Sequence, residues 1–210
     1  MLKLIGVTMT QKRLELWTQK SEDDAVEKLL SSQWVSSSQL LVGINPGSSL
    51  RWPTKQWPVE NFAKLCDELA RRNVRVVITG SPEESGVAEQ LMGLTRNKPV
   101  NAIGKTSITE LVALIRRCQV FISSDSAPMH IASAVHVPLV AIFGPTTREL
   151  GFFPYGPKSA VVELNLPCRP CSLHGGNACP LGHFKCMNDL TPEMVFNPAK
   201  NFLEQASLKK

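Results

Sequence analysis

The sequence predicts an α/β protein built on a Rossmann-like, doubly wound parallel sheet, and three observations lead to this fold class. From Leu40 onward, short runs of β-forming residues alternate with segments of helical periodicity. Two of the helical segments open with a capping box, in which a serine and a glutamate three residues later satisfy the first amides of a helix. With 210 residues, 43% hydrophobic and 20% charged, the chain can bury a substantial core, which excludes a disordered tail or a fibrous repeat.

Five strand and helix units follow one another along the chain. The first strand is expected over residues 40–45, with a helix from about residue 59. The second, over 74–79, precedes a helix that Ser81 and Glu84 cap, and the third, over 100–103, precedes a helix that Ser107 and Glu110 cap. The fourth and fifth strands, over 120–123 and 138–143, flank a helix that runs to about residue 136.

The two ends of the chain do not follow this alternation of strands and helices. Residues 1–39 read as a short β-like opening, an amphipathic helix from Ser21 and a serine-rich joint. We therefore assign 1–39 as a lead-in segment and linker, and 40–210 as one domain that carries a cysteine-bearing loop over residues 168–186. A helix begins near Thr191, and Pro198 inside it is expected to kink it or split it in two.

Charge and hydropathy narrow the classes of partner. Lys and Arg total 23 against 18 Asp and Glu, and the net charge of +5 is spread along the chain instead of forming a block. This pattern suits an anionic small ligand better than nucleic acid. No stretch approaches the roughly 18 continuous apolar residues of a transmembrane helix, so we expect a cytoplasmic protein without a membrane span.

Ligands of open parallel sheets bind beyond the carboxyl ends of the strands, which makes the loops after the strands the candidate site. The loop after the first strand supplies Gly47, which permits close approach of the backbone, the hydroxyls of Ser48 and Ser49, and Lys55 a few residues on. Such groups suit a diphosphate. The alternative is an ordinary turn followed by a surface lysine.

The loop after the fourth strand places a carboxylate beside a helix start. The amides of Ser126 and Ala127 open the helix and are expected to bind an anion. Asp125 then either caps the helix or binds sugar hydroxyls beside a phosphate. His130, one turn further on the same face, either reaches the same ligand or packs as an ordinary side chain. Glu84 has its capping role and could also bind ribose hydroxyls.

Four cysteines fall within the cysteine-bearing loop: Cys168, Cys171, Cys179 and Cys186. Four thiolates at this spacing could close a tetrahedral zinc or iron–sulfur site. The gaps differ from the usual paired C-x2-C pattern. We therefore favour a surface loop that binds no metal and is held by packing or an occasional disulfide, with a metal site as the alternative.

Several of these motifs together resemble glycosyltransferase family nine, the lipopolysaccharide heptosyltransferases. Residues 123–134, followed by 138–146, look like the donor-binding signature of that family, and 46–49, 55–58 and 80–84 match further blocks in the right order. The cysteine-bearing loop is similar to that of the heptosyltransferase II branch. The resemblance implies the two-lobed fold called GT-B, with this chain as the C-terminal, nucleotide-sugar-binding lobe. It also implies ADP-heptose as donor, inversion at the anomeric carbon, and no cofactor or required metal.

The resemblance also implies a role for each candidate residue. The diphosphate would be held by Ser48, Ser49 and Lys55, the ribose by Glu84, and the heptose with its phosphate by Asp125, Ser126, Ala127 and His130. Lys55 and Asp125 are the expected catalytic residues, and Lys55 would stabilise the diphosphate as it leaves.

The acceptor lobe of such an enzyme has no counterpart before Leu40, because 39 residues are too few for a lobe with its own core. We therefore expect a fragment, a truncated reading frame or one half of a split enzyme, which binds the donor and is inactive alone. The missing lobe would bind the lipopolysaccharide core acceptor. The protein itself would associate peripherally with the inner membrane. The alternatives are a non-catalytic partner of an acceptor lobe encoded elsewhere and a metal-binding interaction module.

Overall fold

A six-stranded parallel sheet forms the centre of the computed structural model, which describes residues 4, 6, 14–48, 51–156 and 158–207. The strands lie in the order β3-β2-β1-β4-β5-β6, and each neighbouring pair is parallel. Their bounds are β1 (Leu41–Asn45), β2 (Arg75–Ile78), β3 (Val100–Asn101), β4 (Val120–Ser124), β5 (Leu139–Ile142) and β6 (Ser159–Val162). The order reverses between β1 and β4, which is the topological switch point of a doubly wound sheet. The predicted fold class is confirmed.

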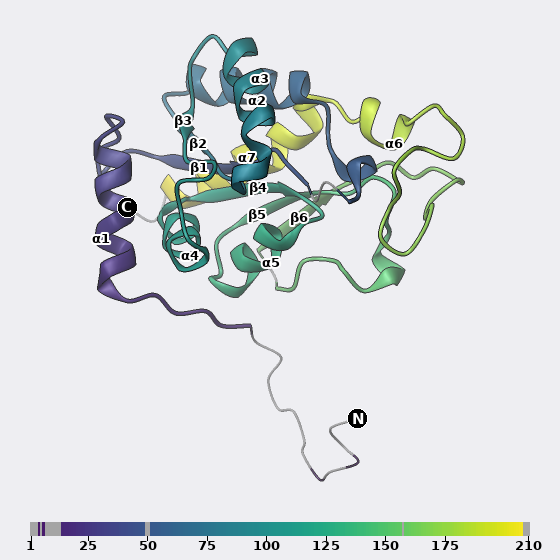
Figure 1. Ribbon diagram of the computed structural model, residues 1–210, viewed down its shortest axis with the longest axis horizontal. Helices are drawn as coiled ribbons and strands as arrows, with labels where there is room; N and C mark the ends of the chain where they lie inside the picture. Colours follow the sequence, from purple (N-terminus) through teal and green to yellow (C-terminus); the bar gives the residue numbers. More distant parts are fainter. Residues whose placement is uncertain (1–3, 5, 7–13, 49–50, 157, 208–210) are drawn as a thin grey trace.

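Helices cover both faces of the sheet (Figure 1). One face carries α2 (Val59–Arg71), α3 (Ser85–Leu94) and α7 (Pro192–Ser207), and the other carries α1 (Lys20–Ser31), α4 (Ile108–Arg117) and α5 (Ala127–Ala134). A short helix, α6 (Lys185–Asn188), ends the cysteine-bearing loop. Single-turn 3-10 helices in the described loops include Pro53–Lys55, Pro82–Glu84 and Arg148–Leu150.

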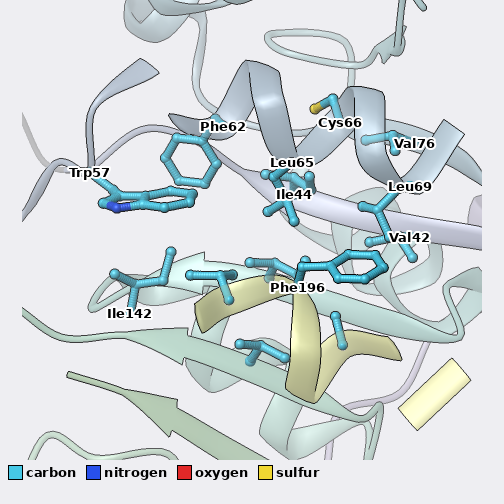
Figure 2. Packing of buried hydrophobic residues seen from close by; sticks show 14 of the residues in the cluster. Val42, Ile44, Trp57, Phe62, Leu65, Cys66, Leu69, Val76, Ile142 and Phe196 are labelled. Carbon is cyan, nitrogen blue, oxygen red and sulfur yellow. The ribbon is translucent and has the colours of Figure 1, made fainter. Parts of the chain in front are cut away.

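The main core lies between α2, α7 and the sheet (Figure 2). Val42 and Ile44 of β1 point into it because alternate residues of a strand face the same side. Trp57, just before α2, packs edge-on against Phe62 and donates a 2.9 Å hydrogen bond from its indole nitrogen to the carbonyl of Leu190. Each of these large side chains contributes about 1.5–3 kcal/mol by its burial. Together they fix β1, and the loop that follows it, against the rest of the domain.

The opposite face buries the helix of the lead-in segment. Val26 and Leu30 of α1 share a buried cluster with Leu41 of β1, Val77 of β2 and Leu114 of α4. The predicted amphipathic helix is therefore present, and its apolar face packs on the sheet beside α4. The β-like opening expected before it lies almost wholly outside the described residues.

Two features differ from the sequence prediction. A sixth strand, β6, pairs with β5; no strand is predicted here from the sequence, because only two of its four residues, Val161 and Val162, are strong strand formers. Pro198 does not split the last helix, because α7 is one element from Pro192 to Ser207. Proline removes one helical hydrogen bond, and the burial of Val195, Phe196 and Ala199 beside it offsets that loss. None of the described helices is both long and apolar enough to span a bilayer.

Candidate functional site

The centre of the candidate site is an ion pair between Lys55 and Asp125. Lys55 ends the 3-10 helix after β1, and Asp125 follows β4 directly, so both lie at the carboxyl edge of the two strands that flank the switch point. The Lys55 Nζ atom lies 2.7 Å from Asp125 Oδ2, and the two side chains are only 10% and 5% exposed. The two expected catalytic residues are thus in direct contact. At this depth charge interactions are stronger than at the surface.

Asp125 has a second partner, and it does not cap α5. Thr146, in the loop after β5, donates a 2.8 Å hydrogen bond from its hydroxyl to the same Asp125 Oδ2. The N-cap residue of α5 is Ser126. The carboxylate therefore joins the loops after β1, β4 and β5. Of the two roles considered for Asp125, the structure does not show the helix cap.

Ser126 connects three strand ends through its hydroxyl. Its Oγ donates to Asn45 Oδ1 at 3.1 Å and lies 3.0 Å from the Ser123 hydroxyl. Asn45 in turn donates from Nδ2 to the Thr79 carbonyl at 2.9 Å. The first turn of α5, which begins at Ala127, is thereby fixed at the edge of the sheet with the positive end of its dipole beside the ion pair.

Glu84 has the predicted capping role and also contacts the loop after β1. Its Oε2 accepts a 2.7 Å hydrogen bond from the Ser81 amide. Its other oxygen lies so close to Gly47 that a Cβ built there would be 1.6 Å away. Burial raises the pKa of the Glu84 carboxyl, against the lowering effect of the Ser81 amide. Glycine is thus needed at position 47 for this contact.

The remaining candidate residues are less engaged with this centre. Ser48 is buried, and its hydroxyl donates to the Trp52 carbonyl at 3.4 Å, within its own loop. Ser49 lies outside the described residues. His130 lies half-buried on α5, and among the described residues no hydrogen bond or ion pair joins it to Lys55 or Asp125.

The four cysteines of the cysteine-bearing loop are free thiols, close enough for their charges to interact. Cys171, Cys179 and Cys186 line one cavity of about 100 Å³, together with Thr54 beside Lys55. Burial, and then the neighbouring thiols, raise the pKa of Cys186 to about 11. In the part of the chain that the structure describes, no group of three or more His, Cys, Asp or Glu side chains is arranged to hold a metal ion.

Sequence reasoning missed three residues that build this site: Asn45, Thr146 and Arg169. Asn45 and Thr146 lie at strand ends, so the strand-end rule could have included them. Arg169 has no such signal. Its buried guanidinium donates to the carbonyls of Gly144, Leu164 and Thr146, contacts that depend on how the cysteine-bearing loop folds back over the sheet.

Residues 3–179 match the sequence model of glycosyltransferase family 9 (heptosyltransferase). The chain belongs to this family. A curated relative of this family 9 chain is lipooligosaccharide heptosyltransferase 2 of Campylobacter jejuni serotype O:2, which is 34% identical over 172 residues. That alignment covers 80% of this chain and 52% of the relative, so the family 9 chain spans about half the length of the curated relatives it matches.

Solved structures agree with the assignment of the chain to family 9. A family 9 glycosyltransferase from Veillonella parvula superposes with a TM-score of 0.83 at 26% identity, over 97% of this chain and 58% of that one. The ADP-heptose lipopolysaccharide heptosyltransferase II of Escherichia coli gives a TM-score of 0.75 at 24% identity, over 92% of this chain and 54% of that one. The predicted class, one part of a GT-B glycosyltransferase, is confirmed.

Proposed function

We propose that this chain is the ADP-heptose-binding half of a lipopolysaccharide core heptosyltransferase. The observation that carries the proposal is the buried Lys55–Asp125 pair beside the first turn of α5, at the switch point of the sheet. This edge is where doubly wound folds bind nucleotides. The names of the relatives, heptosyltransferase 2 and ADP-heptose heptosyltransferase II, supply the donor and the sugar.

The groups at this edge have complementary roles in transfer. The Lys55 ammonium and the helix end neutralise the charge that grows on the diphosphate as its bond to the sugar breaks. Asp125 holds Lys55 in place and accepts hydrogen bonds from heptose hydroxyls, while the ribose hydroxyls bind Glu84. The amides of Ser126 and Ala127 bind phosphate oxygens. Attack of the acceptor from the opposite face of the sugar inverts the anomeric carbon.

The donor experiment is a calorimetric titration of the chain with ADP-heptose and with ADP, using UDP as a matched control nucleotide. The proposal expects saturable binding of both adenosine ligands and weaker binding of UDP. An absence of detectable binding at millimolar ADP-heptose would overturn it. A circular dichroism spectrum of the same sample shows that the protein titrated is folded.

The acceptor is proposed to bind through the other half of the enzyme. A chain that spans about half of its relatives needs a second lobe, on the same polypeptide or on another, to bind the lipopolysaccharide core and supply a general base. We place the assembled enzyme in the cytoplasm at the inner membrane surface, where it would be peripheral. Mixing the chain with the acceptor half of a related heptosyltransferase should give heptose transfer; a mixture that binds donor and transfers nothing contradicts the assignment as half of an enzyme.

A further inference from the structure

We propose that Arg169 and Thr54 are positioning residues for the Lys55–Asp125 pair, and that the cysteine-bearing loop thereby sets the geometry of the donor site. The inference rests on the proposed function for its effect on ligand binding. Its structural part, the control of the ion pair by the loop, stands on contacts alone.

The first contacts run from Arg169 to Asp125. The guanidinium of Arg169, whose side chain is 4% exposed, donates from Nη2 to the Thr146 carbonyl at 2.7 Å, and from Nε to the Gly144 carbonyl. Thr146 then donates from its hydroxyl to Asp125 at 2.8 Å. A planar guanidinium has five donors in a fixed arrangement, so it can hold several carbonyls in one geometry. Arg169 therefore fixes the loop that orients Asp125.

The cysteine-bearing loop contacts the same segment a second time. The amide of Cys171 donates to the Pro145 carbonyl at 2.9 Å, so Gly144, Pro145 and Thr146 are all bound by residues at the start of the loop. Arg169 is itself balanced by Glu163, whose carboxylate lies 2.6 Å from Nη2. Glu163 thus compensates the buried positive charge of Arg169. Arg169 therefore does not compete with Lys55 for Asp125.

The second set of contacts runs to Lys55. Thr54, its direct neighbour, donates from Oγ1 to the Gly176 carbonyl at 2.8 Å and accepts from the Gly176 amide at 2.8 Å. Its own amide also donates to that carbonyl, at 3.3 Å. Gly175 has a φ of +89°, and a Cβ there would lie 3.0 Å from Thr54 Oγ1, so the loop needs glycine to approach this closely. The middle of the loop therefore fixes the 3-10 helix that carries Lys55.

One loop thus holds both members of the ion pair, each through a threonine. Neither Arg169 nor Gly176 contacts Lys55 or Asp125 directly through a hydrogen bond or an ion pair among the described residues. A change in the loop should consequently alter the Lys55–Asp125 geometry without removing either charge. A loop that serves stability alone would leave the environment of the Lys55 ammonium unchanged in a variant that still folds.

The test follows the Lys55 ammonium by ¹⁵N NMR of lysine side chains, assigned with Lys55→Arg. The variants are Arg169→Lys and Thr54→Val, which removes the hydroxyl that bonds Gly176, with Thr54→Ser to restore that hydroxyl. Thr146→Val shows that the signal reports the contact with Asp125, and Thr147→Val is the matched control at the neighbouring position. We expect exchange of the Lys55 ammonium protons with water to speed up at least about tenfold in Arg169→Lys and Thr54→Val, with wild-type behaviour in Thr54→Ser and Thr147→Val.

The dissociation constant for ADP is measured on the same samples and should rise about tenfold in Arg169→Lys and Thr54→Val. An unchanged Lys55 signal in a folded Arg169→Lys or Thr54→Val protein overturns the inference, and the Thr54 variants decide even if Arg169→Lys fails to fold. A wild-type chain that does not bind ADP overturns the proposed function alone, because the Lys55 signal reports the positioning without any ligand.

Discussion

Lys55 and Asp125, which follow different strands, share a buried contact of 2.7 Å between the ammonium nitrogen and a carboxylate oxygen. A lone charge at this depth is strongly unfavourable, so each residue is tolerated because of the other. A ligand with a diphosphate and a polyhydroxylated sugar offers a matching partner to each. The pair is therefore a structural link between the loops after β1 and β4, and we propose it as the receptor for such a ligand.

Removal of one member of this pair should destabilise the fold. Lys55→Met and Asp125→Leu each leave an uncompensated buried charge, at a cost of about 3–5 kcal/mol in the free energy of unfolding. The double variant should recover most of that loss because no charge remains. Urea denaturation of the four proteins measures the coupling, and strictly additive effects of the two changes would contradict the interaction described.

The contact between Gly47 and Glu84 predicts a specific cost for a methyl group. Gly47→Ala places a Cβ where the Glu84 carboxyl lies, so that side chain must turn away from the Ser81 amide. We expect a loss of about 1–2 kcal/mol. Gly86→Ala, at an exposed position of α3 with no atom near its Cβ, should instead stabilise by about 0.5–1 kcal/mol. Equal unfolding midpoints for the two variants would refute the close contact.

The raised pKa of Glu84 predicts how its contribution to stability depends on pH. Burial raises the folded-state pKa above the ordinary value of 4.5, so the folded protein binds this proton more tightly than the unfolded chain. The contribution is full below that value and is lost as the pH rises through the folded-state pKa. Glu84→Gln, which does not titrate, should therefore gain in stability relative to the wild type as the pH rises above about 4.5.

Urea denaturation at several pH values checks the Glu84 prediction. Glu83→Gln is the control, because the Ser81 side chain lowers the pKa of Glu83 and the sign should reverse. A difference between Glu84→Gln and wild type that stays constant across this range, or falls, would show that burial does not control the carboxyl.

The six thiols should differ widely in reactivity. Backbone amides, that of Phe184 first, lower the pKa of Cys179, whereas burial raises the pKa of Cys66 and of Cys118 to about 12. Because the thiolate is the nucleophile, iodoacetamide at pH 8 should label Cys179 first, and the two buried thiols at least ~100-fold more slowly. Peptide mass spectrometry of a time course measures this, with a denatured sample as control. Labelling of Cys66 as fast as Cys179 would contradict the burial described.

The fold could be predicted largely because its signals are local. The capping box at Ser107 marks the start of α4, and the box at Ser81 marks the start of the 3-10 helix that leads into α3. The apolar strands alternate with these helices along the chain. β6 was not predicted because only two of its four residues are strong strand formers. Of the two effects predicted for Pro198, the split does not occur, because the buried face of α7 outweighs proline's local effect on the helix, and only the tertiary structure reveals that face.

The candidate site could likewise be predicted in part from the sequence. The rule that ligands bind at the carboxyl ends of strands predicted that the segments of Lys55 and Asp125 converge, and they do. That Ser48 binds a diphosphate stays a prediction; its hydroxyl donates to the Trp52 carbonyl within its own loop, a contact that residue type does not reveal. Arg169 could not be predicted, since its function depends on the path of the cysteine-bearing loop across the sheet edge.

We infer that the loops at the carboxyl edge of the sheet form a single pocket for a nucleotide sugar. Backbone NMR of the wild-type chain, titrated with ADP and then with ADP-heptose, is the decisive experiment. Both ligands should shift the amides of residues 45–48, 79–84 and 126–127, and only ADP-heptose should strongly shift those of Asp125 and Thr146. The largest shifts at the 240 Å³ cavity at the opposite edge, lined by His136, Tyr155 and other residues, would contradict the account.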